Sequence, residues 1–424
     1  MGLFKSSKHV PQEPLPSLEL HLLDDPDRVF KPDETVAGHI VLTTPIPIKP
    51  QALEVTLWGK SETWIRTEHK SENSTTYYHY RDHAPLFDVT SNVAPKGETF
   101  VPGQVYKFPF GFRVPAGTGY ERSGIYEKPQ DGVWTVGPHN LPPTFWHGAR
   151  VDGPDNCSIS YGVTVRLTPP EVVIGKDNEP ISCTAPILFQ PLNPYAHIQV
   201  PNLTRQDKSF SRQSSVLAGQ EPSTLGFRQR LHDRFSSATP KLDFTLGVEL
   251  PDLLTTGSEF NFRTTFTVAQ RSENVAHIPP ITFKVVKLEL LDFTFFRAPR
   301  DWQASNTMSG SPSKYRDKTP RGKYRADDQV NFEEKKTLLN AVPPSQVVEL
   351  AEVEVPGEKK MTEQGLRCDA WFTGRVPGFT PPSFRSFAIT RSYRVKVKVQ
   401  VGVAGKEFEC SAESTDCEMG SVHT

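Results

Sequence analysis

The sequence predicts an all-β protein built from two tandem antiparallel β-sandwich domains of immunoglobulin-like type, on three observations. Apolar residues recur at every second position in many short segments, which is the period of a half-buried strand. Proline accounts for 39 of the 424 residues, and helix interiors and the central strands of parallel sheets exclude proline. A proline turn followed by an alternating strand occurs twice. Together these features are typical of short strands joined by tight turns in sandwiches.

The expected strands follow in chain order. In the first half the alternating residues are Leu18, Leu20 and Leu22; Leu53, Val55 and Leu57; Tyr106, Phe108, Phe110 and Phe112; and Tyr161, Val163, Val165 and Leu167. In the second half they are Phe260, Phe262, Phe266 and Val268; Leu288, Leu290, Phe293 and Phe295; and Tyr393, Val395, Val397, Val399 and Val401. Charged residues separate the apolar ones in the last strand, so one face packs on a core and the other meets water. A thin apolar stripe over 331–340 predicts one short helix.

The repeated element is a PPxF turn followed by an SYxVxV strand. It occupies residues 141–145 and 160–165 in the first half, and 380–384 and 392–397 in the second. The repeat predicts two sandwiches of one kind. The expected organisation is a flexible N-terminus over 1–17, a first domain over 18–195, a linker over 196–240, a second domain over 241–415 and a tail over 416–424.

Two segments interrupt the strand pattern. The expected linker is rich in Ser, Gln and Arg and poor in apolar residues, which favours a mobile connection. The second domain carries a basic insertion over 298–326. From Arg297 to Arg325 there are eight basic residues against two acidic ones, a local balance of +6. Loops of this length are usually functional or disordered.

Charge, cysteine usage and motifs exclude several classes of function. The 48 basic and 49 acidic residues leave a net charge of −1, which does not steer the whole chain to nucleic acid. No apolar run long enough to span a membrane and no secretion signal is found. The five cysteines, Cys157, Cys183, Cys368, Cys410 and Cys417, form no CxxC pair, which fits a reducing compartment. No catalytic or nucleotide-binding motif occurs, so we expect no enzyme activity, cofactor or metal.

His79 and His83 lie four residues apart, a spacing that suits a metal only on a helix. Their surroundings predict strand and loop, so we interpret them as a solvent-exposed pair.

A series of segments, in order, resembles the arrestin family. In the first half these are VFKPDETVAGHIV at 29–41, LEVTLWG at 53–59 with Trp64 after it, FPFGFRVP at 108–115, LPPTF at 141–145 with the strand at 160–167, and PILFQP at 186–191. In the second half they are PSF at 382–384 and RSYRV at 391–395. The resemblance covers roughly residues 18–415. It is nearer to the fungal α-arrestins than to the visual or β-arrestins.

This resemblance implies two curved sandwiches that act as a non-enzymatic adaptor. The expected partners are cytoplasmic segments of membrane receptors or transporters, bound for endocytosis, trafficking or signalling. The expected location is the cytoplasm, at the periphery of the plasma membrane or endosomes. Two alternatives stay open. One is a retromer-like sorting-coat subunit of arrestin fold, and the other is a hydrolytic β-sandwich enzyme.

Many α-arrestins also recruit HECT ubiquitin ligases through PPxY motifs, and this sequence departs from that pattern. WW domains read a polyproline turn plus the aromatic residue. The residues at the fourth position of the motif that each PP pair begins are Phe145, Val172, Thr282, Gln346 and Phe384. A ligase would therefore have to be reached indirectly, and we assign the two PPxF cases to the fold.

Three sets of residues are candidate sites. The basic residues of the insertion would suit anionic lipid headgroups or a phosphorylated receptor tail, although a solvated loop has the same composition; they are Lys314, Arg316, Lys318, Arg321, Lys323 and Arg325. Gly2 lies in the M-G-x-x-x-[ST] pattern for myristoylation. Ser215, Ser311 and Thr319 are candidate phosphorylation switches.

Overall fold

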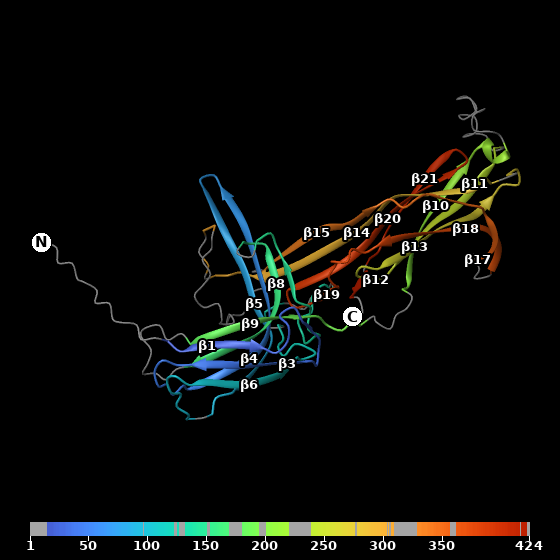
Figure 1. Ribbon diagram of the computed structural model, residues 1–424. Helices are drawn as coiled ribbons and strands as arrows, with labels where there is room; N and C mark the ends of the chain where they lie inside the picture. Colours follow the sequence, from blue (N-terminus) through green and yellow to red (C-terminus); the bar gives the residue numbers. More distant parts are fainter. Residues whose placement is uncertain are drawn as a thin grey trace. The chain divides into compact units, whose positions relative to one another are not determined.

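The computed structural model describes residues 15–95, 97–122, 125–126, 132–150, 153–168, 180–194, 201–219, 239–275, 278–302, 304, 307–308, 329–356, 362–415 and 417–421. These residues form strands and one short 3-10 helix, Ser215–Ala218, and no α-helix occurs among them (Figure 1). The all-β prediction is confirmed. The chain divides into two compact units. Unit 1 comprises Met1–Leu192, Phe295–Phe332 and Arg385–Thr390, and unit 2 comprises Asn193–Thr294, Glu333–Phe384 and Arg391–Thr424.

Unit 1 contains two sheets. The smaller one has the order β1 (Ser17–Leu22), β3 (Thr35–Thr43) and β6 (Val105–Arg113). The larger one has the order β2 (Val29–Phe30), β9 (Ile181–Phe189), β8 (Asn156–Thr168), β4 (Ala52–Ser71) and β5 (Ser74–Asn92), and β7 (Phe145–His147) pairs with β8. The alternating residues of β3, β4 and β8 are buried, which confirms that their period of two reflects one core-facing side.

Unit 2 also contains a pair of main sheets. The first has the order β10 (Leu203–Gln213), β11 (Lys241–Pro251), β13 (Glu259–Arg271), β18 (Thr362–Arg375) and β17 (Ala351–Pro356). The second has the order β15 (Gln329–Ala341), β14 (Ile281–Pro299), β20 (Ile389–Val403) and β19 (Phe384–Arg385), with β16 (Gln346–Val348) on β14 and β21 (Lys406–Glu413) on β20. Strands β12 (Leu253–Thr255) and β22 (Glu418–Gly420) form a short parallel pair.

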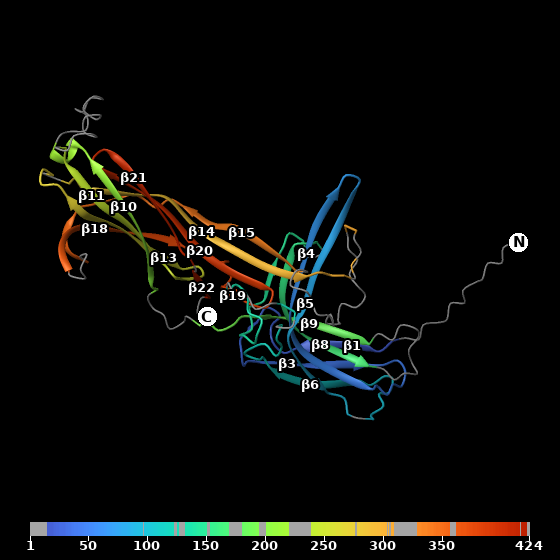
Figure 2. The same cartoon turned by 180° about the vertical axis from the view of Figure 1, so that it is seen from behind.

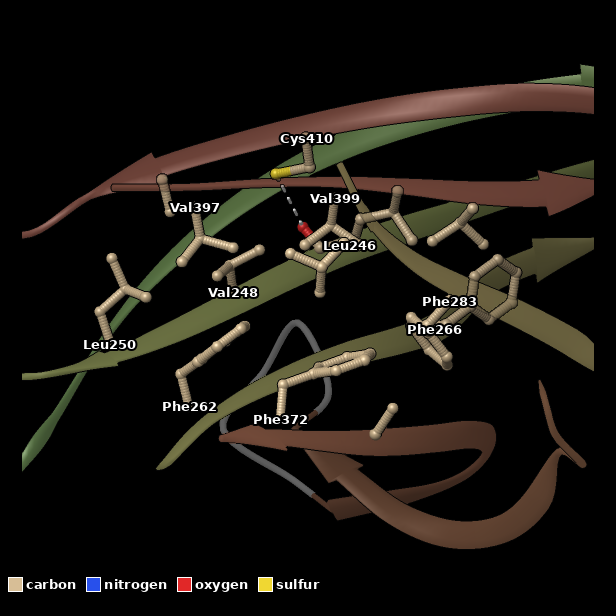
Figure 3. Close-up of a cluster of buried hydrophobic side chains, with 14 of the residues drawn as sticks. Leu246, Val248, Leu250, Phe262, Phe266, Phe283, Phe372, Val397, Val399 and Cys410 are labelled. Carbon is tan, nitrogen blue, oxygen red and sulfur yellow. Dashed lines mark hydrogen bonds between the residues drawn. The ribbon is translucent and has the colours of Figure 1, made fainter. Parts of the chain in front are cut away.

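The core of unit 2 lies between its two main sheets (Figure 3). Strands β11, β13 and β18 supply one layer of apolar side chains, and β14, β20 and β21 supply the other. The Cys410 thiol lies in this core with its sulfur 4.0 Å from the carbonyl oxygen of Leu246. Burial raises the pKa of the Cys410 thiol above its usual value. It therefore behaves as an apolar residue of the core.

The two units repeat one strand plan. The antiparallel set β1, β3 and β6 corresponds to β11, β13 and β18, and the parallel pair β2–β9 corresponds to β12–β22. The repeated PPxF motifs occupy equivalent places. The Thr144 hydroxyl accepts a hydrogen bond from the Phe189 amide at 2.8 Å, and the Ser383 hydroxyl accepts one from the Met419 amide at 2.9 Å. These contacts give the PPxF motifs a structural role in both units.

Two glycines of the first domain occupy places that exclude a side chain. A Cβ atom on Gly38 would lie 2.3 Å from the carbonyl oxygen of His21 across the β1–β3 pair. A Cβ atom on Gly59 would lie 2.7 Å from the ring of Tyr161. Gly59 lies inside β4, which continues to Ser71.

Two predictions of secondary structure are wrong. Residues 203–213, placed in the expected linker, form β10, which pairs with β11 along its whole length. Its polar side chains hydrogen-bond to backbone groups of β21, including Gln206 to the carbonyl oxygen of Glu413 at 2.6 Å. Residues 331–340, expected to be helical, lie in β15. Pairing with β14 outweighs the helix propensity of the Glu and Lys residues there.

Candidate interaction surface

One edge of the β4–β5 hairpin is covered by residues that follow β14. The hairpin projects past the other strands of its sheet (Figures 1 and 2). An antiparallel bridge joins Tyr80 to Arg300, and the Asp301 amide donates to the carbonyl oxygen of His79 at 2.8 Å. We call the described residues 299–302, 304, 307 and 308 the edge segment. The predicted basic insertion therefore begins as an extended segment bound to the edge of β5.

The imidazole of His79 ties the edge segment to β4. Its Nδ1 atom lies 3.2 Å from the indole nitrogen of Trp64, and its Nε2 atom lies 2.9 Å from the carbonyl oxygen of Thr307. The indole can only donate, so Nδ1 accepts and the proton resides on Nε2. Burial lowers the pKa of His79 below its usual 6.5, and the neighbouring Arg81 and Arg66 lower it further. The residue is therefore neutral at pH 7 and donates to the edge segment.

Two arginines of β4 and β5 also bind the edge segment. Arg81 pairs with Asp301 at 2.8 Å, and both side chains are 16% exposed. The Arg81 guanidinium also lies 4.3 Å from the centre of the Trp64 ring. Arg66 donates to the carbonyl oxygen of Met308 at 2.8 Å. These contacts fix both ends of the described edge segment on the hairpin.

Arg300 lies among three aromatic rings. Its guanidinium is 4.0 Å from the ring centre of Tyr78, 5.2 Å from that of Tyr80 and 5.5 Å from that of Trp302. Its Nη1 atom is buried and has no hydrogen-bond partner among the described residues. The ring faces therefore supply much of the local stabilisation of this cation. Trp302 and Met308 extend outward and are 70% and 62% exposed.

A buried ion pair lies on the inner side of β5. Asp82 pairs with Arg122, and the Tyr126 hydroxyl donates to the second carboxylate oxygen of Asp82 at 2.7 Å. Both charged side chains are almost completely buried. Burial raises the pKa of Tyr126 well above its usual value, and Asp82 raises it further. The phenol therefore keeps its proton and donates to the carboxylate.

Arg297 occupies the same interior, at the end of β14. Its guanidinium lies 4.0 Å from the ring centre of Tyr126 and 4.7 Å from that of Trp134. It donates to the carbonyl oxygen of Phe387 at 2.8 Å, and its own carbonyl accepts from the Thr63 hydroxyl at 3.0 Å. The charge count of the basic insertion included Arg297, but this residue is only 3% exposed. It belongs to the core of unit 1.

Most of the predicted site residues fall outside the described residues. These are Gly2, Ser311, Lys314, Arg316, Lys318, Thr319, Arg321, Lys323 and Arg325. Ser215 is described. It begins the 3-10 helix and is 8% exposed, next to the N-cap residue Ser214. A kinase would reach its hydroxyl only after the helix opens.

The two predicted histidines have separate environments. The expectation of a solvent-exposed pair is wrong for His79, which is 1% exposed. His83 lies 2.7 Å from the carboxylate of Glu62, and Lys60 lies 2.9 Å from it. Burial alone would raise the pKa of Glu62, but the hydrogen bonds from His83 and Lys60 lower it to about 2. Across the described ranges, no group of three His, Cys, Asp or Glu side chains is arranged to hold a metal ion.

The aromatic residues of this surface were not predicted as a site. The sequence drew attention to the bases after residue 313 but not to Tyr78, Tyr80 and Trp302. For the two tyrosines a signal was present, because the aromatic run over 77–80 directly precedes Arg81. The run gave no indication that residues 300–308 would lie beside it, because that contact joins positions more than 200 residues apart.

Comparison with known proteins bears on the first part of the chain. Among the residues that the structure describes, no helix is long and apolar enough to cross a membrane. No curated protein matches the chain. Residues 20–119, which include β2 to β6, match the sequence model of the family described as arrestin (or S-antigen), N-terminal domain.

Proposed function

We propose that the protein is a non-enzymatic adaptor of arrestin type. It binds cytoplasmic segments of membrane receptors or transporters and directs them into endocytosis, trafficking or signalling. The observation that carries this proposal is the match of residues 20–119 to the arrestin N-terminal domain. A second unit with the same strand plan supports it, because the arrestin architecture consists of two such sandwiches. Within that family, we propose that the chain is of the fungal α-arrestin kind.

The adaptor would work in the cytoplasm, at the periphery of the plasma membrane or of endosomes. The six bases between Lys314 and Arg325 are accompanied by one acid, Asp317. Each base near an anionic surface contributes about 1 kcal/mol. A myristoyl group on Gly2 would add a marginal anchor that needs such a second signal. Phosphate on Ser311 or Thr319 would weaken the attraction.

A link to ubiquitination would be indirect. The two PPxF motifs form part of the fold in both units, because Thr144 and Ser383 bind neighbouring strands there. None of the PP pairs carries the tyrosine that a WW domain reads. A HECT ligase would therefore reach the cargo through a partner protein or a different contact.

The test is capture of tagged full-length protein from the cells that make it, followed by mass spectrometry. The proposal expects an integral membrane receptor or transporter among the captured proteins. A matched variant has the six bases of the insertion replaced by Gln. In detergent, where no bilayer is present, this variant should still capture the cargo, so the experiment separates cargo binding from membrane attraction. Recovery of a stoichiometric coat complex without cargo would contradict the proposal and favour the sorting-coat alternative.

A further inference from the structure

We propose that Trp302 and Met308 of the edge segment insert into the interfacial layer of an anionic lipid bilayer. The inference rests on the proposed function, because an adaptor for membrane proteins works beside a bilayer. It adds the surface that touches the lipid. The ligand proposed for this region is lipid. The charge of the basic insertion alone would suit a phosphorylated peptide equally well.

Trp302 and Met308 are exposed on a fixed support. Trp302 is 70% exposed and is the most exposed of the six tryptophans, and Met308 is 62% exposed. The backbone beside them is held, because the Asp301 amide binds β5 and the Met308 carbonyl oxygen accepts from Arg66. Exposed apolar side chains that do not fold back on the protein mark an interaction site when they cluster.

The side chains around Arg300 are of the types found at a membrane interface. Tyr78, Tyr80 and Trp302 surround Arg300, and tyrosine and tryptophan are the residues enriched where a bilayer meets water. Amphipathic rings at that depth keep their polar atoms near the headgroups. A peptide ligand recognised by its phosphates would need none of these apolar groups.

The same surface has a positive charge. The described surface carries Arg66, Arg81 and Arg300 against Asp301 and Asp155, whose carboxylate accepts from the Arg66 amide at 3.3 Å, which leaves an excess of one positive charge. The sequence beyond Met308 continues with the six bases of the insertion, before Asp327 and Asp328. Attraction of an anionic leaflet to the bases brings the surface to the membrane, and the two apolar side chains then hold it there.

The experiment measures binding of the purified full-length chain to vesicles of phosphatidylcholine, with and without phosphatidylserine. The wild type is expected to bind the anionic vesicles. The double variant Trp302→Ser/Met308→Ser is expected to bind them roughly tenfold or more weakly. The matched control is Trp146→Ser, because Trp146 is another tryptophan of unit 1 and is 49% exposed. It should bind as the wild type does.

A second measurement locates the contact. Brominated lipids quench tryptophan fluorescence at the depth of the bromine, so they should quench the wild type more than Trp302→Phe. Equal quenching, equal vesicle binding by the double variant, or no binding of the wild type to either vesicle would overturn the inference. If the double variant loses captured cargo in detergent but keeps its vesicle binding, the surface binds protein and the inference is also wrong. Loss of vesicle binding with cargo retained supports it, whereas failure of cargo capture by the wild type contradicts only the proposed function.

Discussion

The hydroxyl of Tyr161 donates to the carbonyl oxygen of Pro142 across 2.5 Å in the interior of unit 1. The same relationship recurs in unit 2, where the hydroxyl of Tyr393 donates to the carbonyl oxygen of Pro381 at 2.7 Å. Both tyrosines are fully buried, and burial raises the pKa of each phenol above its usual value. The tyrosine of each SYxVxV strand thus fastens the PPxF turn that precedes it. This contact explains why both motifs occur together, once in each half.

Removing either hydroxyl should destabilise its own unit. Tyr161→Phe or Tyr393→Phe leaves a buried carbonyl oxygen without its donor, which costs about 1–3 kcal/mol. Hydrogen exchange resolved along the chain measures this loss separately in β8 and β20. Tyr120→Phe is the control, because the Tyr120 hydroxyl binds Asp88 at the surface. Protection left unchanged in β8 by Tyr161→Phe would show that this hydrogen bond does not stabilise the turn.

The buried pair of Asp82 and Arg122 should be sensitive to loss of one partner. Asp82→Ala leaves a buried guanidinium without its carboxylate, and such changes cost about 3–5 kcal/mol. Urea denaturation followed by circular dichroism measures the free energy of unfolding. The exposed pair of Arg113 and Asp33 is the control, with side chains that are 71% and 61% exposed, and Arg113→Ala should cost less than about 1 kcal/mol through this pair. Similar costs for the two changes would contradict the role given to Asp82.

Acid should release the edge segment from the hairpin. The pKa of His79 is lowered in the folded protein, so its stabilising contribution is present above the unfolded value near 6.5 and is lost as the pH falls below it. Protonation would place a hydrogen on Nδ1, which faces the indole N–H of Trp64. Hydrogen exchange of the Asp301 amide reports the release and should accelerate, after correction for intrinsic exchange, between pH 7 and lower pH. A His79→Gln variant should lack this pH dependence, and its persistence there would assign it to another group.

A negative charge on Ser215 should open the start of unit 2. The residue is 8% exposed in its 3-10 helix, and an unpaired charge there costs far more than a neutral polar group, so the glutamate would take up a proton or the helix would unfold. Ser215→Glu should therefore lower the free energy of unfolding measured in urea. Ser209→Glu is the control, because Ser209 is exposed on β10 and should tolerate the charge. Equal stability of the two variants would argue against a structural switch at Ser215.

The strand pattern was predictable wherever a strand has one buried side. The alternation of Tyr393, Val395, Val397 and Val399 predicted β20 because every second residue faces the core. Strand β10 was not predictable in this way. It lies at a sheet edge, and its polar side chains bind β21, as Gln206 and Lys208 do. A hydrogen bond to a distant backbone leaves no period in the sequence.

The candidate surface was predictable only in its charge. The bases of the insertion are visible in the sequence, whereas the enclosure of Arg300 by Tyr78 and Tyr80 depends on a pairing of distant segments. The burial of Arg297 beside Trp134 depends on long-range packing as well. A count of basic residues does not distinguish an arginine on the surface from one in the core. Only the folded structure shows which arginine is buried.

The proposed function requires the chain to dock onto the cytoplasmic part of a membrane protein. Its most direct test is a titration of the purified full-length protein against soluble cytoplasmic segments of the receptors or transporters recovered by capture. Saturable binding of at least one such segment is expected, without a lipid or a coat subunit present. Absence of binding to every recovered segment, together with a stable complex with coat subunits, would contradict it.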